Sequence, residues 1–206
     1  MKSRKNLLEQ LKNLPYFSKD VVRQLGGQLG LKNTTVDTYI SRFLKCKEIF
    51  KLKKGMYISA DFYSKNKGDI SYPFYLANIL RKPSYVSSWA ALQYYNLTTE
   101  SIRTITSVTQ KTTRTYDTKV GSFSYQSIQK ELFSDFSSAK GRFNFFIASP
   151  AKALFDLLYF KTHQFRGVKM ENIKLMVERL RIDINEIDNS EQDKFYEIIK
   201  KYLKHE

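Results

Sequence analysis

Cysteine and histidine are scarce in this chain of 206 residues, which contains one cysteine and two histidines. With Cys46 alone, no disulfide can form within the chain, and this fits a reducing compartment. His163 and His205 lie far from Cys46 in the sequence and show no ligand spacing. We therefore expect no metal site, and no other pattern in the sequence predicts a cofactor.

Long apolar segments are also missing. No run approaches the ~18–20 apolar residues that a membrane-spanning helix needs, so no membrane partner is expected. Residues 1–6 are basic, but the apolar core of a signal peptide does not follow them. The expected location is therefore the cytoplasm.

Acidic residues are few, with 20 Asp and Glu against 35 Lys and Arg, and the net charge is +15. Residues 1–67 hold 15 basic and five acidic residues, a net charge of +10. An excess of this size favours a polyanionic partner such as DNA, RNA or an anionic membrane surface. Its concentration in the first third of the chain indicates a basic N-terminal module. A solvated, lysine-rich surface without a binding role is the alternative.

Three short helices are predicted in the first part of the chain. The first covers residues 3–13 and ends before Pro15. Ser18 is a suitable N-cap for the second helix, which the Gly26–Gly27 pair is expected to weaken or end. The third begins near Asn33 or Thr34, both of which are N-cap types. The faces predicted to be buried carry Leu7, Leu8, Leu11, Leu14, Val21, Val22, Leu25, Val36, Tyr39, Ile40, Phe43 and Leu44.

A β-hairpin is predicted after these helices. Residues 49–58 form two short apolar and polar alternations joined by a Lys-Lys-Gly turn. Three helices followed by a basic hairpin is the order of a winged helix-turn-helix. Residues 64–69 are polar and break both periodicities, so we place a domain boundary there, with a winged helix-turn-helix at 1–67 and a second domain at 68–206.

The second domain is predicted to mix helices and strands. Helices are expected near residues 73–81 and 87–96, and residues 102–126 are expected to form two or three antiparallel strands. A further strand at 143–147 precedes Ser149 and Pro150, which favour a helix start, and more helices follow from Met170. The fold class is therefore α+β, a winged helix-turn-helix followed by a mixed domain with a small antiparallel sheet.

The third helix and the hairpin carry the candidate DNA contacts. An α-helix fits the major groove, where base edges present a distinguishable hydrogen-bond code. Arg42 suits bidentate contact to guanine and Lys45 suits phosphate, while Asp37 is expected to favour the positive end of its own helix. The hairpin lysines are expected to meet the backbone or minor groove. The predicted DNA-binding residues are Lys32, Thr34, Thr35, Thr38, Ser41, Arg42, Lys45, Lys51, Lys53 and Lys54.

Four segments resemble the abortive-infection AbiEi antitoxins. They are TTVDTYISRFL at 34–44, IFKLKKGMY at 49–57, PSYVSSWAALQYYNL at 83–97 and IASPAKALFDLL at 147–158. The resemblance extends to about residue 180. The family often has a charged pair of Glu and Arg where this chain has Ala151 and Lys152, so only Lys152 keeps a charge.

The resemblance implies a type IV toxin–antitoxin regulator. Such a protein represses its own operon by binding inverted repeats in the promoter, an arrangement that is compatible with a dimer on double-stranded DNA. It opposes a nucleotidyltransferase-like toxin without forming a stable complex, and its second domain carries the antitoxin activity. On this basis we expect a regulator and not an enzyme.

Two other functions remain as alternatives. One is a transcriptional regulator without a toxin partner. The other is a nucleic-acid-cleaving enzyme that uses Asp117 and Lys119, although no upstream acidic partner is well placed for them. Asp156 is expected to be a hydrogen-bonded structural carboxylate, and Cys46 to be a small, buried or half-buried apolar residue. For the three helices and the hairpin of residues 1–67, the alternative to DNA binding is binding to another protein.

Overall fold

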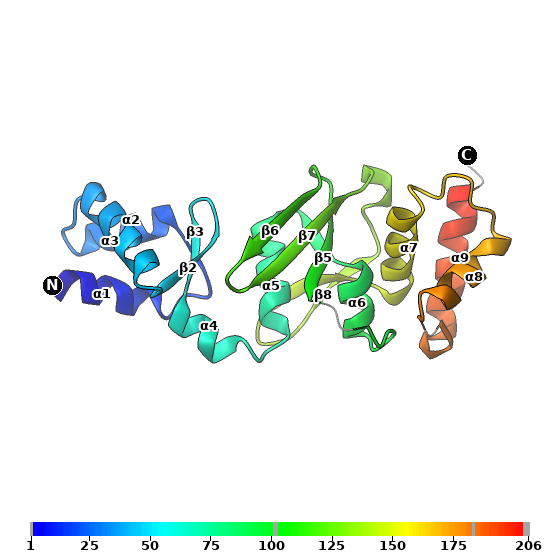
Figure 1. Ribbon diagram of the computed structural model, residues 1–206, viewed down its shortest axis with the longest axis horizontal. Helices are drawn as coiled ribbons and strands as arrows, with labels where there is room; N and C mark the ends of the chain where they lie inside the picture. Colours follow the sequence, from blue (N-terminus) through cyan, green and yellow to red (C-terminus); the bar gives the residue numbers. More distant parts are fainter. Residues whose placement is uncertain (1, 101–102, 183, 204–206) are drawn as a thin grey trace. The chain divides into compact units, whose positions relative to one another are not determined.

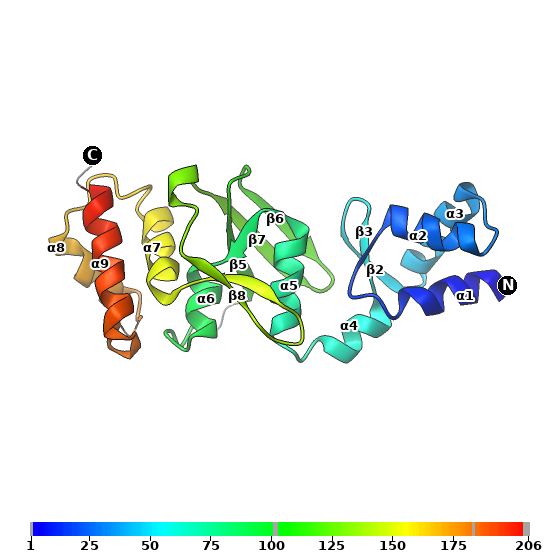
Figure 2. The same ribbon diagram turned by 180° about the vertical axis from the view of Figure 1, so that it is seen from behind.

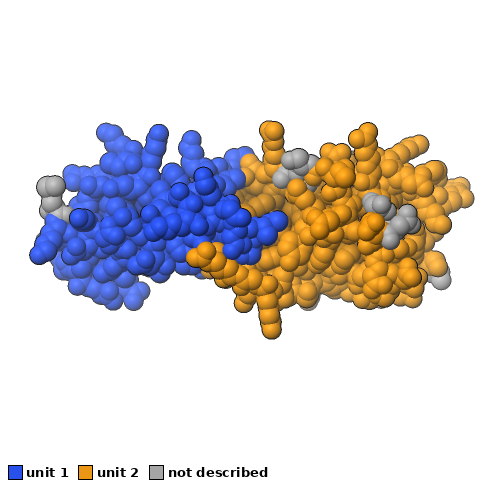
Figure 3. Space-filling model, turned by 90° about the horizontal axis from the view of Figure 1, so that it is seen from below, with its two compact units in different colours: residues 1–72, 116–121 blue, residues 73–115, 122–206 orange. Residues whose placement is uncertain are grey.

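The computed structural model describes residues 2–100, 103–182 and 184–203 and has a mixed α+β fold. Its internal contacts divide the chain into two compact units (Figure 3). One comprises residues 1–72 with 116–121, and the other comprises 73–115 with 122–206. The break after residue 72 lies five residues beyond the boundary expected from the sequence, and a short segment of the later chain belongs to the first unit.

The first unit contains a group of helices and a small sheet (Figure 1). In chain order its elements are α1 (Lys2–Leu11), β1 (Phe17–Ser18), α2 (Lys19–Gln28), α3 (Asn33–Lys45), β2 (Ile49–Lys53), β3 (Met56–Ser59) and α4 (Ala60–Asn66). The sheet order is β1-β3-β2, and both pairings are antiparallel. The hairpin predicted at 49–58 is confirmed.

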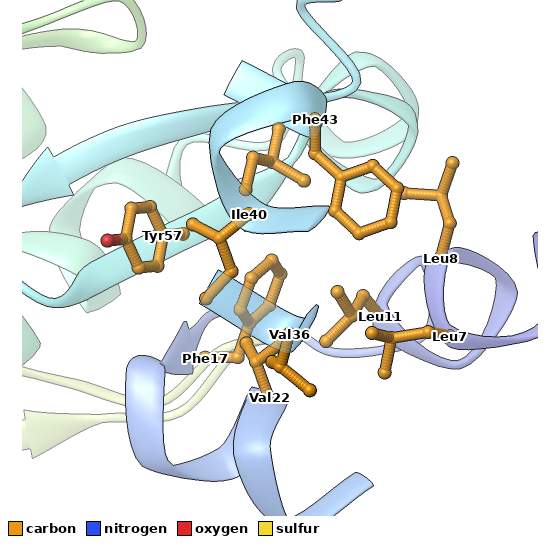
Figure 4. Close-up of a cluster of buried hydrophobic side chains, with 10 residues drawn as sticks. Leu7, Leu8, Leu11, Phe17, Val22, Val36, Ile40, Phe43 and Tyr57 are labelled. Carbon is orange, nitrogen blue, oxygen red and sulfur yellow. The ribbon is translucent and has the colours of Figure 1, made fainter. Parts of the chain in front are cut away.

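Apolar side chains from all three N-terminal helices meet in one core (Figure 4). Val36, Ile40 and Phe43 of α3 are buried there, as the helical spacing predicts. Residues of α1, α2 and the sheet complete the cluster: Leu7, Leu8, Leu11, Phe17, Val22, Ile49 and Tyr57. This core holds α3 by one face and leaves its opposite face outside.

The glycine pair does not end the second helix. Ser18 caps α2 as predicted, because its side chain accepts a hydrogen bond from the Val21 N–H. The helix continues through Gly26 and Gly27 and ends at Gln28, one residue after the pair, so the glycines do not terminate it themselves. A β-carbon on Gly26 would lie 2.4 Å from Cγ2 of Val36. Gly26 therefore permits the close approach of α2 and α3.

Three other local predictions for the first unit need correction. The N-cap of α3 is Lys32, without a side-chain cap, so Asn33 and Thr34 already lie inside the helix. The polar residues 64–66 are helical, because Ser59 caps α4 and that helix runs to Asn66. The two-residue strand β1 was not predicted, since two residues show no alternation.

The rest of the chain forms a sheet with helices. Its elements are α5 (Ser71–Leu80), β4 (Ser84–Val86), α6 (Ser88–Tyr94), β5 (Thr104–Thr109), β6 (Arg114–Thr118), β7 (Gly121–Ser127), β8 (Phe136–Ala139), β9 (Phe145–Ala148), α7 (Pro150–Lys161), α8 (Glu171–Arg179) and α9 (Asn189–Leu203). Short 3-10 helices lie at Lys130–Leu132 and Ile184–Glu186. The helix start predicted at Ser149 and Pro150 is confirmed.

The larger sheet has six strands in the order β6-β7-β5-β4-β9-β8. It is mixed, because β5 pairs in parallel with β7 and β4 pairs in parallel with β9, while β4–β5 and β8–β9 are antiparallel. The small antiparallel sheet expected in the second domain was therefore wrong. Strand composition indicated strands in this region but contained no information on which strands would become neighbours.

Helices cover this sheet (Figures 1 and 2). Helix α6 packs on β5, and α7 packs between α6 and α9. Nine consecutive residues of α7, Ala151–Tyr159, are buried, including two charged side chains. No helix in the described part of the chain is both long and apolar enough to cross a bilayer.

Candidate nucleic-acid interface

Helix α3 presents a continuous polar face outside the core of the first unit. Lys32 at its N-cap, Thr34, Thr38, Ser41, Arg42 and Lys45 are exposed, whereas Thr35 is half-buried. Arg42 and Lys45 therefore point away from the core, as the spacing of the buried residues requires. The thirteen residues of α3 make it about 20 Å long at ~1.5 Å per residue, which is sufficient to cross a major groove.

Two hydroxyls on this face already donate to the helix backbone. Thr38 Oγ1 donates to the Thr34 carbonyl at 3.0 Å, and Ser41 Oγ donates to the Asp37 carbonyl at 3.1 Å. In this conformation each hydroxyl offers an acceptor lone pair, not its proton. The guanidinium of Arg42 and the ammonium of Lys45 are then the stronger donors on the surface.

Asp37 does not interact with the end of its own helix. Its first-turn position was expected, but the first turn of α3 contains no acidic residue. Its carboxylate instead forms ion pairs with Lys19 Nζ and Arg23 Nη2 of α2, both at 2.8 Å. The hydrogen bonds from Arg23 and then Lys19 lower the pKa of Asp37. The sequence prediction missed these partners because they lie 14 and 18 residues away.

The hairpin carries the second group of basic residues. Lys51 in β2 and Lys54 in the turn are exposed, and Lys53 is half-buried. The register shifts between Lys51 and Lys53, which rotates the strand just before the turn. Gly55 has a φ of +74°, a left-handed conformation that glycine adopts without steric cost.

Lys19 joins the hairpin turn to α3. Its backbone N–H donates to the Gly55 carbonyl at 2.9 Å, and its Nζ lies 2.8 Å from Asp37 Oδ2. The adjacent residue Ser18 pairs with Met56 in the β1–β3 ladder. One residue at the start of α2 therefore contacts both the turn and the third helix. This places the lysine-bearing turn beside α3 and not on the opposite side of the unit.

Most acidic residues of this region form ion pairs with nearby basic residues. Glu9 pairs with Lys12, Glu48 with Arg4, Asp61 with Lys65, and Asp37 with its two partners, while Asp20 lies in the first turn of α2. Within the described part of the chain, no ion pair involves the exposed cations Lys32, Arg42, Lys45, Lys51 and Lys54. Uncompensated positive charge therefore lies on α3 and the hairpin, and also on exposed lysines elsewhere in the first unit, such as Lys5, Lys47 and Lys67.

Comparisons with known proteins add no family. No protein-family model matches this chain, and no curated protein does. The resemblance to the AbiEi antitoxins therefore depends on the four quoted segments alone.

The second candidate site, Asp117 and Lys119, gathers no metal ligands. Both residues are exposed, Asp117 in β6 and Lys119 in the turn that follows it. Among the residues that the structure describes, no three His, Cys, Asp or Glu side chains are grouped so that they could hold a metal ion. The nuclease alternative gains no support from this geometry.

Lys152 and Asp156 form a buried ion pair in the second unit. They occupy successive turns of α7, with Lys152 Nζ 2.7 Å from Asp156 Oδ1 and both side chains at most 2% exposed. The other oxygen of Asp156 accepts from Ser87 Oγ at 2.6 Å and from the Tyr85 hydroxyl at 3.1 Å. Burial raises the pKa of Asp156, and the Lys152 ammonium opposes that shift. Asp156 is therefore buried and hydrogen-bonded, as predicted.

Cys46 lies at the surface. It is the C-cap of α3 and is exposed, so the expectation of a buried or half-buried apolar residue was wrong. The expectation followed the usual behaviour of a free cysteine, but the chain turns at Lys47, whose φ is +57°. That turn redirects the chain into β2 and leaves Cys46 outside the core.

Proposed function

We propose that residues 1–67 form a winged helix-turn-helix that binds double-stranded DNA. In this proposal α2 and α3 are the helix-turn-helix, α3 enters the major groove, and the β2–β3 hairpin is the wing. The observation that carries the proposal is the double contact of Lys19, which ties the hairpin turn and α3 to the same residue. With α3 and the hairpin held by the same residue, α3 can occupy the major groove while the hairpin contacts the adjacent sugar–phosphate backbone.

Each basic residue has a distinct role in this proposal. Arg42, in the middle of the exposed face of α3, reads a base edge, and a guanine suits its two-pronged donor geometry. Lys45 and Lys32 contact phosphates on either side of the groove. Lys51 and Lys54 contact the sugar–phosphate backbone beside it. Asp37 stays with Lys19 and Arg23 and therefore does not expose an unpaired carboxylate to the duplex.

We further propose that the protein is a transcriptional autorepressor and the antitoxin of a type IV toxin–antitoxin pair. This rests on the resemblance of residues 34–44, 49–57, 83–97 and 147–158 to the AbiEi antitoxins. The promoter inverted repeats are the proposed DNA target, and a nucleotidyltransferase-like toxin is the proposed functional partner. The second unit would carry the antitoxin activity.

Binding to the DNA upstream of the gene tests the DNA-binding proposal. Footprinting with the full chain is expected to protect an inverted repeat. Arg42→Ala is expected to reduce the preference for that site over unrelated DNA by about tenfold, because one bidentate base contact contributes roughly 1–3 kcal/mol. Lys54→Ala is expected to weaken binding to all sequences equally and to lower the salt slope by about one.

An exposed lysine of the second unit provides the control. Lys200→Ala removes the same charge from α9 and is expected to leave both the preference and the salt slope unchanged. Equal effects of Lys54→Ala and Lys200→Ala would contradict the wing assignment. An unchanged site preference in Arg42→Ala would contradict base reading by α3.

The antitoxin proposal has a separate test. If a nucleotidyltransferase-like gene lies next to this one, its expression alone is expected to stop growth, and co-expression of this chain is expected to restore it. Arg42→Ala should still restore growth when expressed from a foreign promoter, because the antitoxin activity is assigned to the second unit. Absence of such a gene would favour a regulator without a toxin partner.

A further inference from the structure

The one tryptophan of the chain lies at the surface of the second unit. Trp89 is the second residue of α6 and is half-buried. No other aromatic ring contacts it among the residues that the structure describes. Tyr94 of the same helix differs, because its ring packs against Phe74 and Phe145. Trp89 therefore does not belong to the aromatic cluster beside it, and part of its large apolar ring faces outwards.

An open hollow of about 350 Å³ lies beside this ring. All of the residues that line it belong to the second unit, and they are Trp89, Glu100, Arg179, Leu180 and Arg181. An isolated antiparallel bridge between Thr98 and Ile182 joins the segment after α6 to the segment after α8. Ile182 is also buried. The two sides of the hollow are therefore held together by packing and backbone pairing, and not by the charged side chains.

Three cations surround the tryptophan. Lys161 Nζ, from the last turn of α7, lies 5.8 Å from the centre of the ring, while Arg179 and Arg181 line the hollow. All three are exposed, and no ion pair within the described part of the chain involves them. Glu100 is the one acidic residue of the lining, so three positive charges and one negative charge leave a net charge of +2.

Helix ends explain only part of this arrangement. Lys161 and Arg179 lie in the last turns of α7 and α8, where a cation complements the negative end of the helix. That effect acts on each helix separately and does not require a shared aromatic ring. Arg181 follows the C-cap Leu180 and lies beyond the last turn, to which the effect is confined. Helix electrostatics therefore do not account for three cations around one ring.

We propose that Trp89, Lys161, Arg179 and Arg181 form a surface that binds single-stranded nucleic acid. A base stacks on the Trp89 ring, and the phosphates next to that base contact the three cations. Stacking of this kind needs a base whose face is free, which a single strand offers and a paired duplex does not. The surface is separate from the proposed duplex-binding surface of α3 and the hairpin, and the inference does not depend on that proposal.

The fluorescence of Trp89 reports directly on this surface, because the chain has no second tryptophan. Titration of the full chain with oligouridylate of about twelve nucleotides is expected to quench the emission to a plateau. Oligothymidylate of the same length identifies the kind of strand. Equal quenching supports a site for any single strand, and stronger quenching by oligouridylate supports a site that also contacts the ribose 2′-hydroxyl.

Two polyanions without free bases are the controls for stacking. Inorganic polyphosphate carries closely spaced phosphates and no bases, so it is expected to leave the Trp89 emission unchanged. A DNA duplex of the same length as the oligonucleotides is also expected to leave it unchanged, even if it binds through α3. Quenching by either control as strong as that by oligouridylate would show that charge alone is responsible, and would overturn the proposal.

Substitutions of single charges test the phosphate contacts. The quenching affinity is expected to fall with salt with a slope of about −2, because three cations contribute ~0.7 each on a single strand. Arg181→Ala should weaken binding about fivefold and reduce the slope by ~0.7. Lys174→Ala is the matched control, since it removes an exposed cation of α8 that lines a different hollow. Glu100→Gln should bind about threefold more tightly, because a like charge beside the phosphates is lost.

Substitutions of the ring test stacking, with anisotropy of a labelled oligouridylate as the measurement. Trp89→Leu is expected to weaken binding about tenfold, whereas Trp89→Phe, which keeps an aromatic face, should retain most of the affinity. Melting temperatures of the two variants show whether both are folded. Equal losses of affinity in two folded variants would contradict stacking on the ring.

The outcomes also separate this surface from the proposed DNA-binding surface. Arg42→Ala alters α3 and is expected to leave the quenching by oligouridylate unchanged. A loss of duplex binding without a loss of quenching would therefore affect only the winged-helix proposal. The present proposal is overturned if oligouridylate does not quench Trp89, or if Arg181→Ala and Lys174→Ala have equal effects.

Discussion

Asp37 places a negative charge on α3, the helix that we propose reads DNA bases. The basic residues that pair with this carboxylate determine its effect. Lys19 and Arg23 neutralise it and at the same time connect α2 to α3. Its pKa is lowered below the ordinary value of 3.8, so the charged form is favoured in the folded protein. A carboxylate in this position therefore stabilises the orientation of α3 at neutral pH and does not oppose a polyanion directly.

We expect Asp37→Asn to lower the melting temperature by about 1–2 °C at pH 7. Because the folded pKa is lower than the unfolded pKa, the contribution is complete above about pH 4 and is lost as the pH falls through the folded pKa. Melting curves followed by circular dichroism at pH 7 and pH 3 measure this. The difference between the two proteins should narrow as the pH is lowered from 7 to 3, and a constant difference would contradict the ion-pair assignment.

Lys152 and Asp156 make a second residue-scale prediction. Lys152→Met should lower the free energy of unfolding by about 3–5 kcal/mol, because it leaves the Asp156 carboxylate buried without its cation. Adding Asp156→Asn should recover part of that loss, since a neutral amide can still bond to Ser87 and Tyr85. Urea unfolding of the three proteins measures both changes. Equal stabilities of the single and double variants would show that the charge is not the cause.

At the scale of elements, local chemistry predicted helix starts better than helix ends. Ser18 and Ser149 were identified as N-caps from their residue type and position, and both accept the expected backbone hydrogen bond. The packing role of Gly26 was not predicted, because it depends on Val36, ten residues later. A propensity scale counts the entropic cost of glycine but contains no term for a neighbouring helix.

Substitutions of the two glycines in α2 distinguish the effect of helix propensity from the effect of helix packing on stability. Gly26→Ala should destabilise the protein by about 1–3 kcal/mol, because its new methyl group meets the buried Val36 side chain. Gly27→Ala is the matched control, since no atom outside the local helix lies within 4 Å of its β-carbon. This variant should gain up to about 1 kcal/mol from helix propensity. Thermal unfolding compares them, and a stabilising Gly26→Ala would show that α2 and α3 do not approach so closely.

At the scale of the whole molecule, the net charge of +15 is distributed unevenly along the chain. Ion pairs involve most of the acidic groups in the first unit, whereas none among the described residues involves Lys32, Arg42, Lys45, Lys51 or Lys54. A protein that bound DNA through its general charge would release many counterions. A protein that bound DNA only through α3 and the hairpin would release far fewer counterions.

The salt dependence of DNA binding distinguishes the two cases. With contacts from Lys32, Arg42, Lys45, Lys51 and Lys54, the slope of log K against log salt should be about −4 to −5 for double-stranded DNA. The slope is measured by fluorescence anisotropy, in which a labelled duplex is titrated with the protein at several salt concentrations from about 50 to about 300 mM. A slope beyond about −8 would indicate that cations outside this surface take part.

The sequence by itself determined the order of helices and hairpin in the first unit, which helix faces turn towards its core, and the outward direction of Arg42 and Lys45. These follow from periodicity, because a helix repeats every ~3.6 residues and a strand every two whatever surrounds them. The N-caps at Ser18 and Ser149 could also be predicted from the sequence, because each hydrogen bond joins residues only three positions apart.

Only the tertiary structure decided the features that depend on distant residues. They include the Lys19 contacts to Gly55 and Asp37, the approach of α2 to α3 at Gly26, and the parallel pairing of β5 with β7. The common reason is that packing brings together groups that are far apart in the chain. Residue propensity and sequence spacing do not indicate which distant groups will become neighbours.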